Sequence, residues 1–264
     1  MVGRRPLNAA KVGSEDNPRT IGDKIWSLIK ELVIVVVGAL IIAALIRAFV
    51  GQMFLVPSGS MEHTLNVGDR IAVQKITDFK RGDVVVFKDP NHWLGDEPQT
   101  EERGPIGKGL EWIGVLPNTS SEYLVKRAIG LPGDHVVCCD TDGRITVNGQ
   151  ALDESSYLYK SGGSQSKPSD FPFDVVVPRD RIWVMGDHRD NSADSRCHLD
   201  DQSADGEYMS AFVPTDDVVG PVFAIVAPFS RAELLKRPAT FEPVPDAKGP
   251  PAAEPVVKTP NVRC

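Results

Sequence analysis

The residues with the clearest chemical potential are the two serines of Pro57-Ser58-Gly59-Ser60-Met61, a tight turn that follows the chain's one membrane-length apolar stretch. A serine hydroxyl becomes a nucleophile when a neighbouring base removes its proton. A turn close to a membrane surface would hold such a nucleophile where a membrane-embedded substrate emerges. The sequence therefore predicts a reactive serine if the chain also supplies a base and an oxyanion donor.

Lys126 is a possible base for such a serine. It lies in the apolar stretch 123–129, where strand alternation places Leu124, Lys126 and Ala128 on one face. Burial on such a face lowers the pKa of a lysine from about 10.4 towards neutrality. At the unshifted value only about one amine in 2,500 is neutral near pH 7, so burial would make Lys126 a usable general base. For this strand taken alone, a lysine that extends into solvent from a sheet edge is the better interpretation, and the loop 186–196 described below shifts the balance towards a base.

Histidine is the more common partner of a nucleophilic serine, and the chain has five histidines. None lies in a Gly-x-Ser-x-Gly turn, but His63, three residues after Ser60, and the pair Asp187-His188 leave a Ser-His-Asp triad open. A second Ser-x-x-Lys spacing at 164–167 lies in a Ser/Gly-rich loop and lacks the accompanying Lys-Thr-Gly motif, which excludes it.

A third segment, 186–196, is dense in hydrogen-bonding side chains that could orient a base. Its Asp190-x-Ser192-x-Asp194 spacing is similar to that of a calcium loop, yet the required glycine and terminal glutamate are absent. The sequence therefore predicts a supporting loop here and no metal site.

Composition and charge are those expected of an ordinary globular protein that does not bind nucleic acid. Hydrophobic residues make up 41% and charged residues 25%, and the net charge of -7 comes without a basic face, which argues against nucleic acid as a partner. The four cysteines form no Cys-x-x-Cys pair, so we expect no structural zinc and no cofactor. Cys197 could pair with Cys138 or Cys139 outside the cytoplasm, or the thiols could stay free, and the sequence does not choose.

The apolar stretch predicts one transmembrane helix over 32–50. No charge interrupts 32–46, and the 19 residues to Val50 are close to the roughly 20 that a bilayer requires. Residues 1–31 carry six Lys or Arg, so the positive-inside tendency predicts a cytoplasmic N-terminal tail and an exported remainder. A cleaved secretory signal is the alternative, but its apolar core typically has about 7–15 residues and no Ala-x-Ala-like site follows here.

The exported remainder, 51–236, is predicted to be mainly β, because short apolar runs alternate with turn signals. Asn148-Gly149 is a strong hairpin turn. The proline-rich tail 237–264 is predicted to be disordered. The expected strands cover 70–76, 83–87, 123–129, 135–139, 144–147, 173–177, 181–185 and 218–226.

Two insertions are expected, over 89–121 and over 135–178, the second with a Ser/Gly-rich part at 155–170. Trp93 and Trp112 of the first insertion either pack against their own domain or contact lipid as interfacial anchors.

Together and in this order, these segments resemble the bacterial type I signal peptidases. The matching motifs are P-S-G-S-M-x-x-T-L (57–65), G-D-R (68–70), R-G-D-V-V-V-F (81–87), K-R-A-I-G-L-P-G-D (126–134) and G-D-x-R-D-N-S-A-D-S-R (186–196). The single anchor and the insertion after Phe87 are similar to Gram-positive, actinobacterial enzymes. Three positions depart from the family pattern: His63, His188 and Cys197 stand where proline, asparagine and an aromatic residue are usual.

The resemblance implies a coiled antiparallel β-sheet ectodomain of signal-peptidase type, with its core over 51–88, 122–134 and 179–230. It makes Ser60 the nucleophile and Lys126 the general base, with the Ser60 backbone N–H and the Ser58 hydroxyl as the oxyanion hole. The implied supporting residues are Ser192, which would hydrogen-bond the lysine amine, and Arg127, Asp187, Arg189, Asp194 and Arg196. The implied substrate-pocket residues are Val56, Met61, Leu65, Leu124 and Val125.

The function implied is that of a membrane-anchored serine endopeptidase that removes signal peptides from exported preproteins through an acyl-enzyme. Its partners would be those signal peptides, the lipid bilayer and the secretion translocon. Three alternatives stay open: a self-cleaving Ser-Lys repressor, whose DNA-binding domain is replaced here by a membrane helix, a non-enzymatic membrane-tethered binding protein, and a peptidase dedicated to one substrate such as a pilin.

Overall fold

The computed structural model describes residues 21–49, 51–95, 104, 107–109 and 122–259. The chain divides into two compact units, Met1–Ile42 and Ala43–Cys264.

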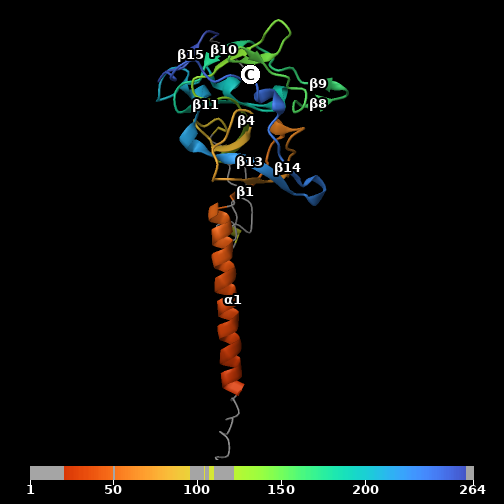
Figure 1. Cartoon of the computed structure of the whole chain (residues 1–264), viewed down its shortest axis with the longest axis vertical. Coiled ribbons are helices and arrows are strands. Elements are labelled where there is room, and N and C mark those ends of the chain that lie inside the picture. Colours follow the sequence, from red (N-terminus) through yellow and green to blue (C-terminus); the bar gives the residue numbers. More distant parts are fainter. Residues whose placement is uncertain (1–20, 50, 96–103, 105–106, 110–121, 260–264) are drawn as a thin grey trace, which may run out of the picture. The chain divides into compact units, whose positions relative to one another are not determined.

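Helix α1, Ile21–Phe49, forms the described part of the first unit up to Ile42 and continues beyond that boundary to Phe49 (Figure 1). Its stretch Lys24–Ile42 has a mean hydropathy of 2.4 and is long and apolar enough to cross a membrane. The side chains of Leu32, Ile34 and Val35 are exposed, as expected for a helix that has no protein core around it. The helix begins at Ile21, inside the stretch predicted as the N-terminal tail; residues 21–32 contain no proline, and their one glycine, Gly22, lies in the first turn.

The larger unit is mainly β (Figure 1). It contains an eight-stranded antiparallel sheet in the order β1-β2-β13-β3-β4-β11-β12, with β14 paired to β13. These strands are β1 Gln52–Leu55, β2 Arg70–Val73, β3 Val84–Lys88, β4 Tyr123–Gly130, β11 Arg181–Met185, β12 Val213–Pro214, β13 Val218–Ala227 and β14 Glu233–Leu234. Strands β3 and β4 lie side by side at its centre, with Val85 opposite Lys126.

A second antiparallel sheet has the order β15-β10-β5-β6-β7, and a separate hairpin joins β8 to β9. The strands are β5 His135–Cys138, β6 Ile145–Val147, β7 Gln150–Ala151, β8 Lys160–Ser161, β9 Ser164–Gln165, β10 Phe173–Val176 and β15 Val256–Val257. Asn148 and Gly149 connect β6 to β7 with φ values of 53° and 84°, the left-handed conformation that a tight two-residue hairpin requires.

Seven short 3-10 turns lie in the loops of the larger unit within the described residues. They are η1 Gly59–Met61, η2 Arg189–Asn191, η3 Ser195–His198, η4 Met209–Ala211, η5 Thr215–Asp217, η6 Phe229–Arg231 and η7 Ala239–Phe241.

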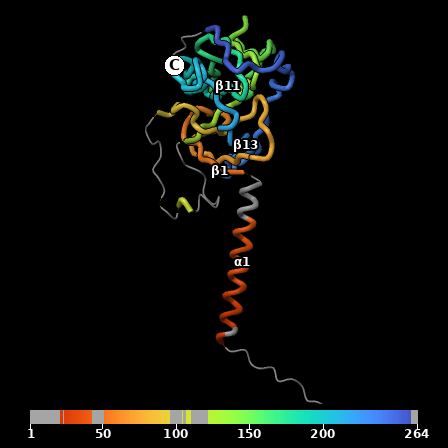
Figure 2. Tube along the Cα trace, turned by 90° about the vertical axis from the view of Figure 1, so that its left-hand side faces the viewer, coloured from red at the N-terminus to blue at the C-terminus, as the bar shows by residue number. Residues whose placement is uncertain are grey.

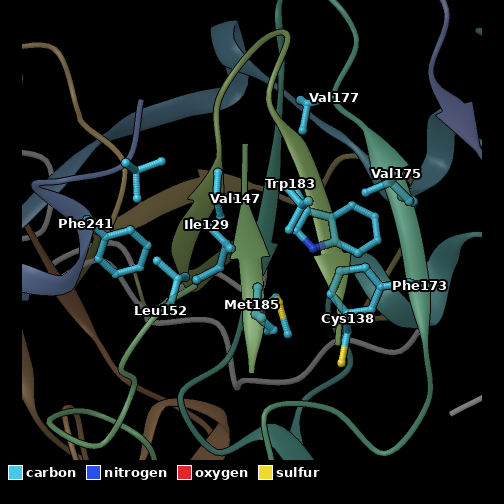
Figure 3. Packing of buried hydrophobic residues seen from close by; sticks show 14 of the residues in the cluster. Ile129, Cys138, Val147, Leu152, Phe173, Val175, Val177, Trp183, Met185 and Phe241 are labelled. Carbon is cyan, nitrogen blue, oxygen red and sulfur yellow. The ribbon is translucent and has the colours of Figure 1, made fainter. Parts of the chain in front are cut away.

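The main apolar core joins the two sheets. Trp183 of β11 packs against Phe173 of β10 with ring centroids 5.2 Å apart, and Ile129 and Met185 lie beside them (Figure 3). Strand β3 is buried on both faces, with Val84 and its alternate neighbours in one cluster and Val85 with its neighbours in another. Burial on both faces explains why residues 84–87 of this strand form an uninterrupted apolar run.

Each predicted strand is present, with ends that differ by up to three residues. The C-terminal tail is different: the predicted disorder is wrong for residues 237–259. Phe241 is buried in the main core, and β15 pairs with β10, placing Val257 opposite Val175. In Figure 2 the blue C-terminal part of the trace lies against the body of the larger unit, near β11. Proline suits an extended edge segment, so a proline-rich composition does not exclude packing.

Trp93 packs within its own domain. It is 8% exposed, stacks on His198 at 4.3 Å between ring centroids, and donates from Nε1 to the Ser210 carbonyl at 3.0 Å. Trp112 lies outside the described residues.

Cys138 and Cys139 form a disulfide with each other, so the structure contradicts a bond from Cys197 to either of them. Cys138 is the last residue of β5 and Cys139 follows it, whereas Cys197 lies in η3.

Candidate active site

Ser60 and Lys126 meet in the larger unit although 66 residues separate them in sequence. Ser60 lies on the turn η1 and Lys126 at the middle of β4, and Lys126 Nζ is 2.6 Å from Ser60 Oγ. Ser60 is 7% exposed and Lys126 3% exposed. A hydroxyl and an amine at hydrogen-bond distance in a dry site are the arrangement of a nucleophile with its base.

The environment of Lys126 favours the neutral amine. Burial is the largest effect and lowers the pKa of Lys126 to about 8. The carboxylates of Asp194 and Asp187 act in the other direction, because they favour the ammonium form. The Arg196 guanidinium adds to the lowering. At a pKa of about 8, roughly one amine in ten is neutral at pH 7, compared with about one in 2,500 for an exposed lysine.

Ser58 stands beside the nucleophile. Its Oγ lies 3.4 Å from Ser60 Oγ, and its side chain is exposed at the edge of the turn. A hydroxyl in this position can turn towards a carbonyl that Ser60 attacks.

An ion pair beneath the site joins Arg127 to Asp187. Arg127 Nε and Nη2 donate to the two Asp187 carboxylate oxygens at 2.8 and 2.5 Å, and Arg127 Nη1 donates to the Gly82 carbonyl at 2.7 Å. Thr64 Oγ1 donates to Asp187 at 2.5 Å, and the Arg127 guanidinium lies over the Tyr157 ring. This pair ties β4 to the loop after β11 and to the segment after η1.

A second buried pair joins Asp194 to Arg196. Arg196 donates from Nε and Nη2 to the two Asp194 carboxylate oxygens at 2.8 and 2.9 Å. Asp194 also accepts the Gly186 N–H at 2.8 Å and the Ser192 hydroxyl at 2.7 Å. Burial alone would raise the pKa of the Asp194 carboxyl, but Arg196 and these donors hold it below its usual value.

Ser192 therefore bonds Asp194, and not the lysine amine. Within the described residues, no hydrogen bond joins Ser192 to Lys126. Ser192 still lies against the site, because a Cβ at Gly186 would collide with both Ser192 Oγ and the Ser60 carbonyl. The backbone approaches so closely here that only glycine fits at position 186.

Arg189 is held by residues that sequence reasoning missed. Its guanidinium donates to both Glu154 carboxylate oxygens, at 2.5 and 3.2 Å, and to the Pro168 carbonyl at 2.6 Å. Tyr157 donates its hydroxyl to the same Glu154 at 2.6 Å. Glu154 is 4% exposed. The one available signal was a glutamate in the apolar vicinity of Leu152 and Leu158, and it lies inside the predicted insertion.

The Ser-His-Asp alternative finds no support in this geometry. The His188 ring contacts the Gly59 carbonyl and Glu62, and Asp187 is the partner of Arg127.

The five predicted pocket residues are all buried, and four of them share one cluster. Val56, Met61, Leu65 and Val125 pack together, while Leu124 belongs to the cluster of Val85 and Phe87. Leu124 points away from the others because it alternates with Val125 along β4.

A cavity of about 620 Å³ lies near the site, lined in part by His63, Arg127 and Tyr157. Neither Ser60 nor Lys126 lines it, so it is not the place of the Ser60 chemistry. No cluster of three or more potential metal ligands occurs in the part of the chain that the structure describes.

Comparison with known proteins gives consistent matches. A family model described as signal peptidase, peptidase S26, matches residues 29–227. Signal peptidase I of Mycobacterium tuberculosis (strain CDC 1551 / Oshkosh) is 34% identical over 250 residues, covering 86% of this chain and 81% of the relative. Probable signal peptidase I of Mycobacterium leprae (strain TN) is 35% identical over 235 residues, covering 78% of each chain. The solved signal peptidase I of Enterococcus faecalis V583 aligns with a TM-score of 0.32 and 21% identity, over 55% of this chain and 97% of that chain.

Proposed function

This chain belongs to the signal peptidases of peptidase family S26 and is a signal peptidase hydrolase, and we propose that it works through a dyad of Ser60 and Lys126. The observation that carries the proposal is the 2.6 Å separation of Lys126 Nζ and Ser60 Oγ, with both residues buried. A base must reach the proton that it removes, and this base does.

In the proposed reaction the neutral Lys126 amine takes the Ser60 proton while Oγ attacks the scissile carbonyl carbon. The Ser60 N–H and the Ser58 hydroxyl stabilise the resulting oxyanion. The Lys126 ammonium then gives its proton to the leaving amine as the peptide bond breaks, which leaves an acyl-Ser60 ester. Water, deprotonated by Lys126, hydrolyses that ester and restores the serine.

We further propose that Arg127, Asp187, Arg189, Asp194 and Arg196 hold the loops of this site, with Ser192 beside them. An extended preprotein segment would pair with the backbone near the site, and small apolar pockets formed by the cluster of Val56, Met61, Leu65 and Val125 would select small side chains. Leu124 would act on that pocket only through β4.

Helix α1 is proposed to anchor the chain in the bilayer as a single pass, with the N-terminus cytoplasmic and the larger unit extracellular. Its length and composition support an anchor, and the six basic residues in 1–31 support the direction. Preprotein signal peptides, the bilayer and the secretion translocon are the proposed partners.

The pH dependence should follow the titration of Lys126. Because the neutral amine is the reactive form and its pKa is lowered to about 8, kcat/KM should rise about tenfold per pH unit below pH 7 and level off above about pH 8. The measurement is a pH–rate profile for one model preprotein, with enzyme stability checked at each pH. A limb that continues to rise beyond pH 10 would instead indicate an ordinary, exposed lysine.

The experiment that tests the proposed function is active-site labelling of the full chain in detergent. A serine-reactive acylating peptide inhibitor should add one acyl group, which peptide mapping should locate on Ser60, and it should block preprotein cleavage in proportion to labelling. Ser164→Ala, which alters an exposed serine of the Ser-x-x-Lys spacing, is the matched control and should label normally. Labelling of Ser164, or cleavage that continues in fully acylated enzyme, would overturn the proposal, and a binding protein should not react at all.

A further inference from the structure

We propose that His188 is a positioning residue that aims the Ser60 N–H at the oxyanion, an inference that rests on the proposed function. His188 is one of the positions that depart from the family pattern, and the proposed proton transfers do not use it.

His188 contacts two successive carbonyls of the turn that bears the nucleophile. Its backbone N–H donates to the Ser60 carbonyl at 3.1 Å, and its ring Nδ1 lies 3.2 Å from the Gly59 carbonyl oxygen. The same Nδ1 lies 3.0 Å from Glu62 Oε2. A carbonyl and a carboxylate only accept hydrogen bonds, so Nδ1 must carry the hydrogen that both share.

The ring itself is held in place. It stacks on Tyr159 with ring centroids 3.7 Å apart and an interplanar angle of 23°, and its side chain is 12% exposed. Glu62 faces Nδ1, and Asp190 Oδ1 lies 3.8 Å from Nε2. A ring that is stacked on one face and hydrogen-bonded at Nδ1 loses little additional freedom when it binds the turn.

The contact with Gly59 matters because of peptide geometry. The Gly59–Ser60 peptide is trans and planar, so its C=O and its N–H point in opposite directions. A donor that fixes the Gly59 oxygen therefore fixes the direction of the Ser60 N–H, which is the proposed backbone donor of the oxyanion hole. The Glu62 N–H, 3.0 Å from the same oxygen, holds it from within the turn. His188 thus acts on the transition state through the turn, without touching substrate.

The test compares His188→Leu with His188→Asn in the full chain, using a model preprotein. Leucine keeps the bulk of the ring and removes the donor, so kcat should fall about 10-fold while KM changes less than about 2-fold, because the oxyanion donor acts mainly in the transition state. Asparagine supplies an amide N–H that can reach the Gly59 oxygen, and it should restore kcat to within about 3-fold of the original.

The affinity for a peptide aldehyde distinguishes a lost oxyanion donor from loosened packing, because loosened packing would weaken the aldehyde and its matching alcohol alike. The aldehyde forms a tetrahedral adduct with Ser60 whose oxygen occupies the oxyanion position, whereas the matching peptide alcohol forms no adduct. His188→Leu should weaken the aldehyde about 10-fold and leave the alcohol unchanged. Glu62→Ala removes the acceptor that competes with the Gly59 oxygen for the Nδ1 hydrogen, so it should not weaken the aldehyde.

His135→Asn is the matched histidine control, since His135 bonds Asp174 in the second sheet, and it should change neither constant. Three results would overturn the role of His188: equal losses of affinity for aldehyde and alcohol, a change confined to KM, or no rescue by asparagine in a folded variant. In each case, Ser60 acylation of the unaltered chain would still support the proposed function. Absence of that acylation would instead remove both.

Discussion

Lys126→Met is expected to reduce preprotein cleavage by about 10⁴-fold, because the variant loses the group that accepts the Ser60 proton and then donates it to the leaving amine. Methionine fills nearly the same volume and has no amine, so the change removes the proton acceptor and leaves the packing around β4 intact. Since burial already disfavours a charge at this position, the variant should unfold at the same or a higher denaturant concentration than the original chain. Single-turnover cleavage and equilibrium unfolding measure the two effects.

Ser60→Ala should cause a loss of the same order, and the double variant should be little worse than either single one, because the two residues act as a unit. Lys88→Met on the neighbouring strand is the control: Lys88 is exposed, and its loss should leave cleavage unchanged. Additive losses in the double variant, or more than about 1% residual activity in Lys126→Met, would show that another group removes the Ser60 proton.

The strands that form the centre of the sheet were predictable because their sequence satisfies a local rule. Residues 84–87 are apolar on both faces of the sheet, and Asn148-Gly149 supplies a left-handed turn geometry that favours a two-residue hairpin. Strands β12 and β15 follow no such rule. Each has two residues, and β15 exists because Val256 and Val257 pair with β10 about eighty positions earlier in the chain.

In the candidate site, too, some features were predictable from the sequence and others were not. Lys126 stands out in sequence as a charge in an apolar strand, and Ser60 as a turn residue after an apolar stretch. Their separation of 2.6 Å, however, results from sheet register and loop packing, which no local pattern encodes. Glu154 went unrecognised because its partner Arg189 is 35 residues away. The sequence shows that Ser192 and Asp194 lie in one motif, but their hydrogen bond depends on side-chain geometry that the sequence does not show.

Asp194→Asn is expected to lower the free energy of unfolding by about 3–5 kcal/mol, the usual cost of leaving one member of a buried ion pair without its counter-charge. Asp194 is fully buried and Arg196 is 2% exposed, so water cannot replace the lost carboxylate. The double variant Asp194→Asn, Arg196→Met should recover part of that loss, because it removes the unpaired charge as well. Denaturant unfolding of four chains, the original, Asp194→Asn, Arg196→Met and the double variant, completes the double-mutant cycle. Asp142→Ala, which alters an exposed pair with Arg144, should have no measurable effect.

The same substitution should also move the pH–rate profile, and in a defined direction. The Asp194 carboxylate favours the ammonium form of Lys126, whereas Arg196 opposes it. Loss of the carboxylate alone should therefore lower the pKa of Lys126 further below about 8 and shift the acidic limb of kcat/KM to lower pH, while loss of both charges should return the limb towards its original position. Because a shift to higher pH cannot arise from removing a negative charge beside an amine, that result would mean that the limb belongs to a group other than Lys126.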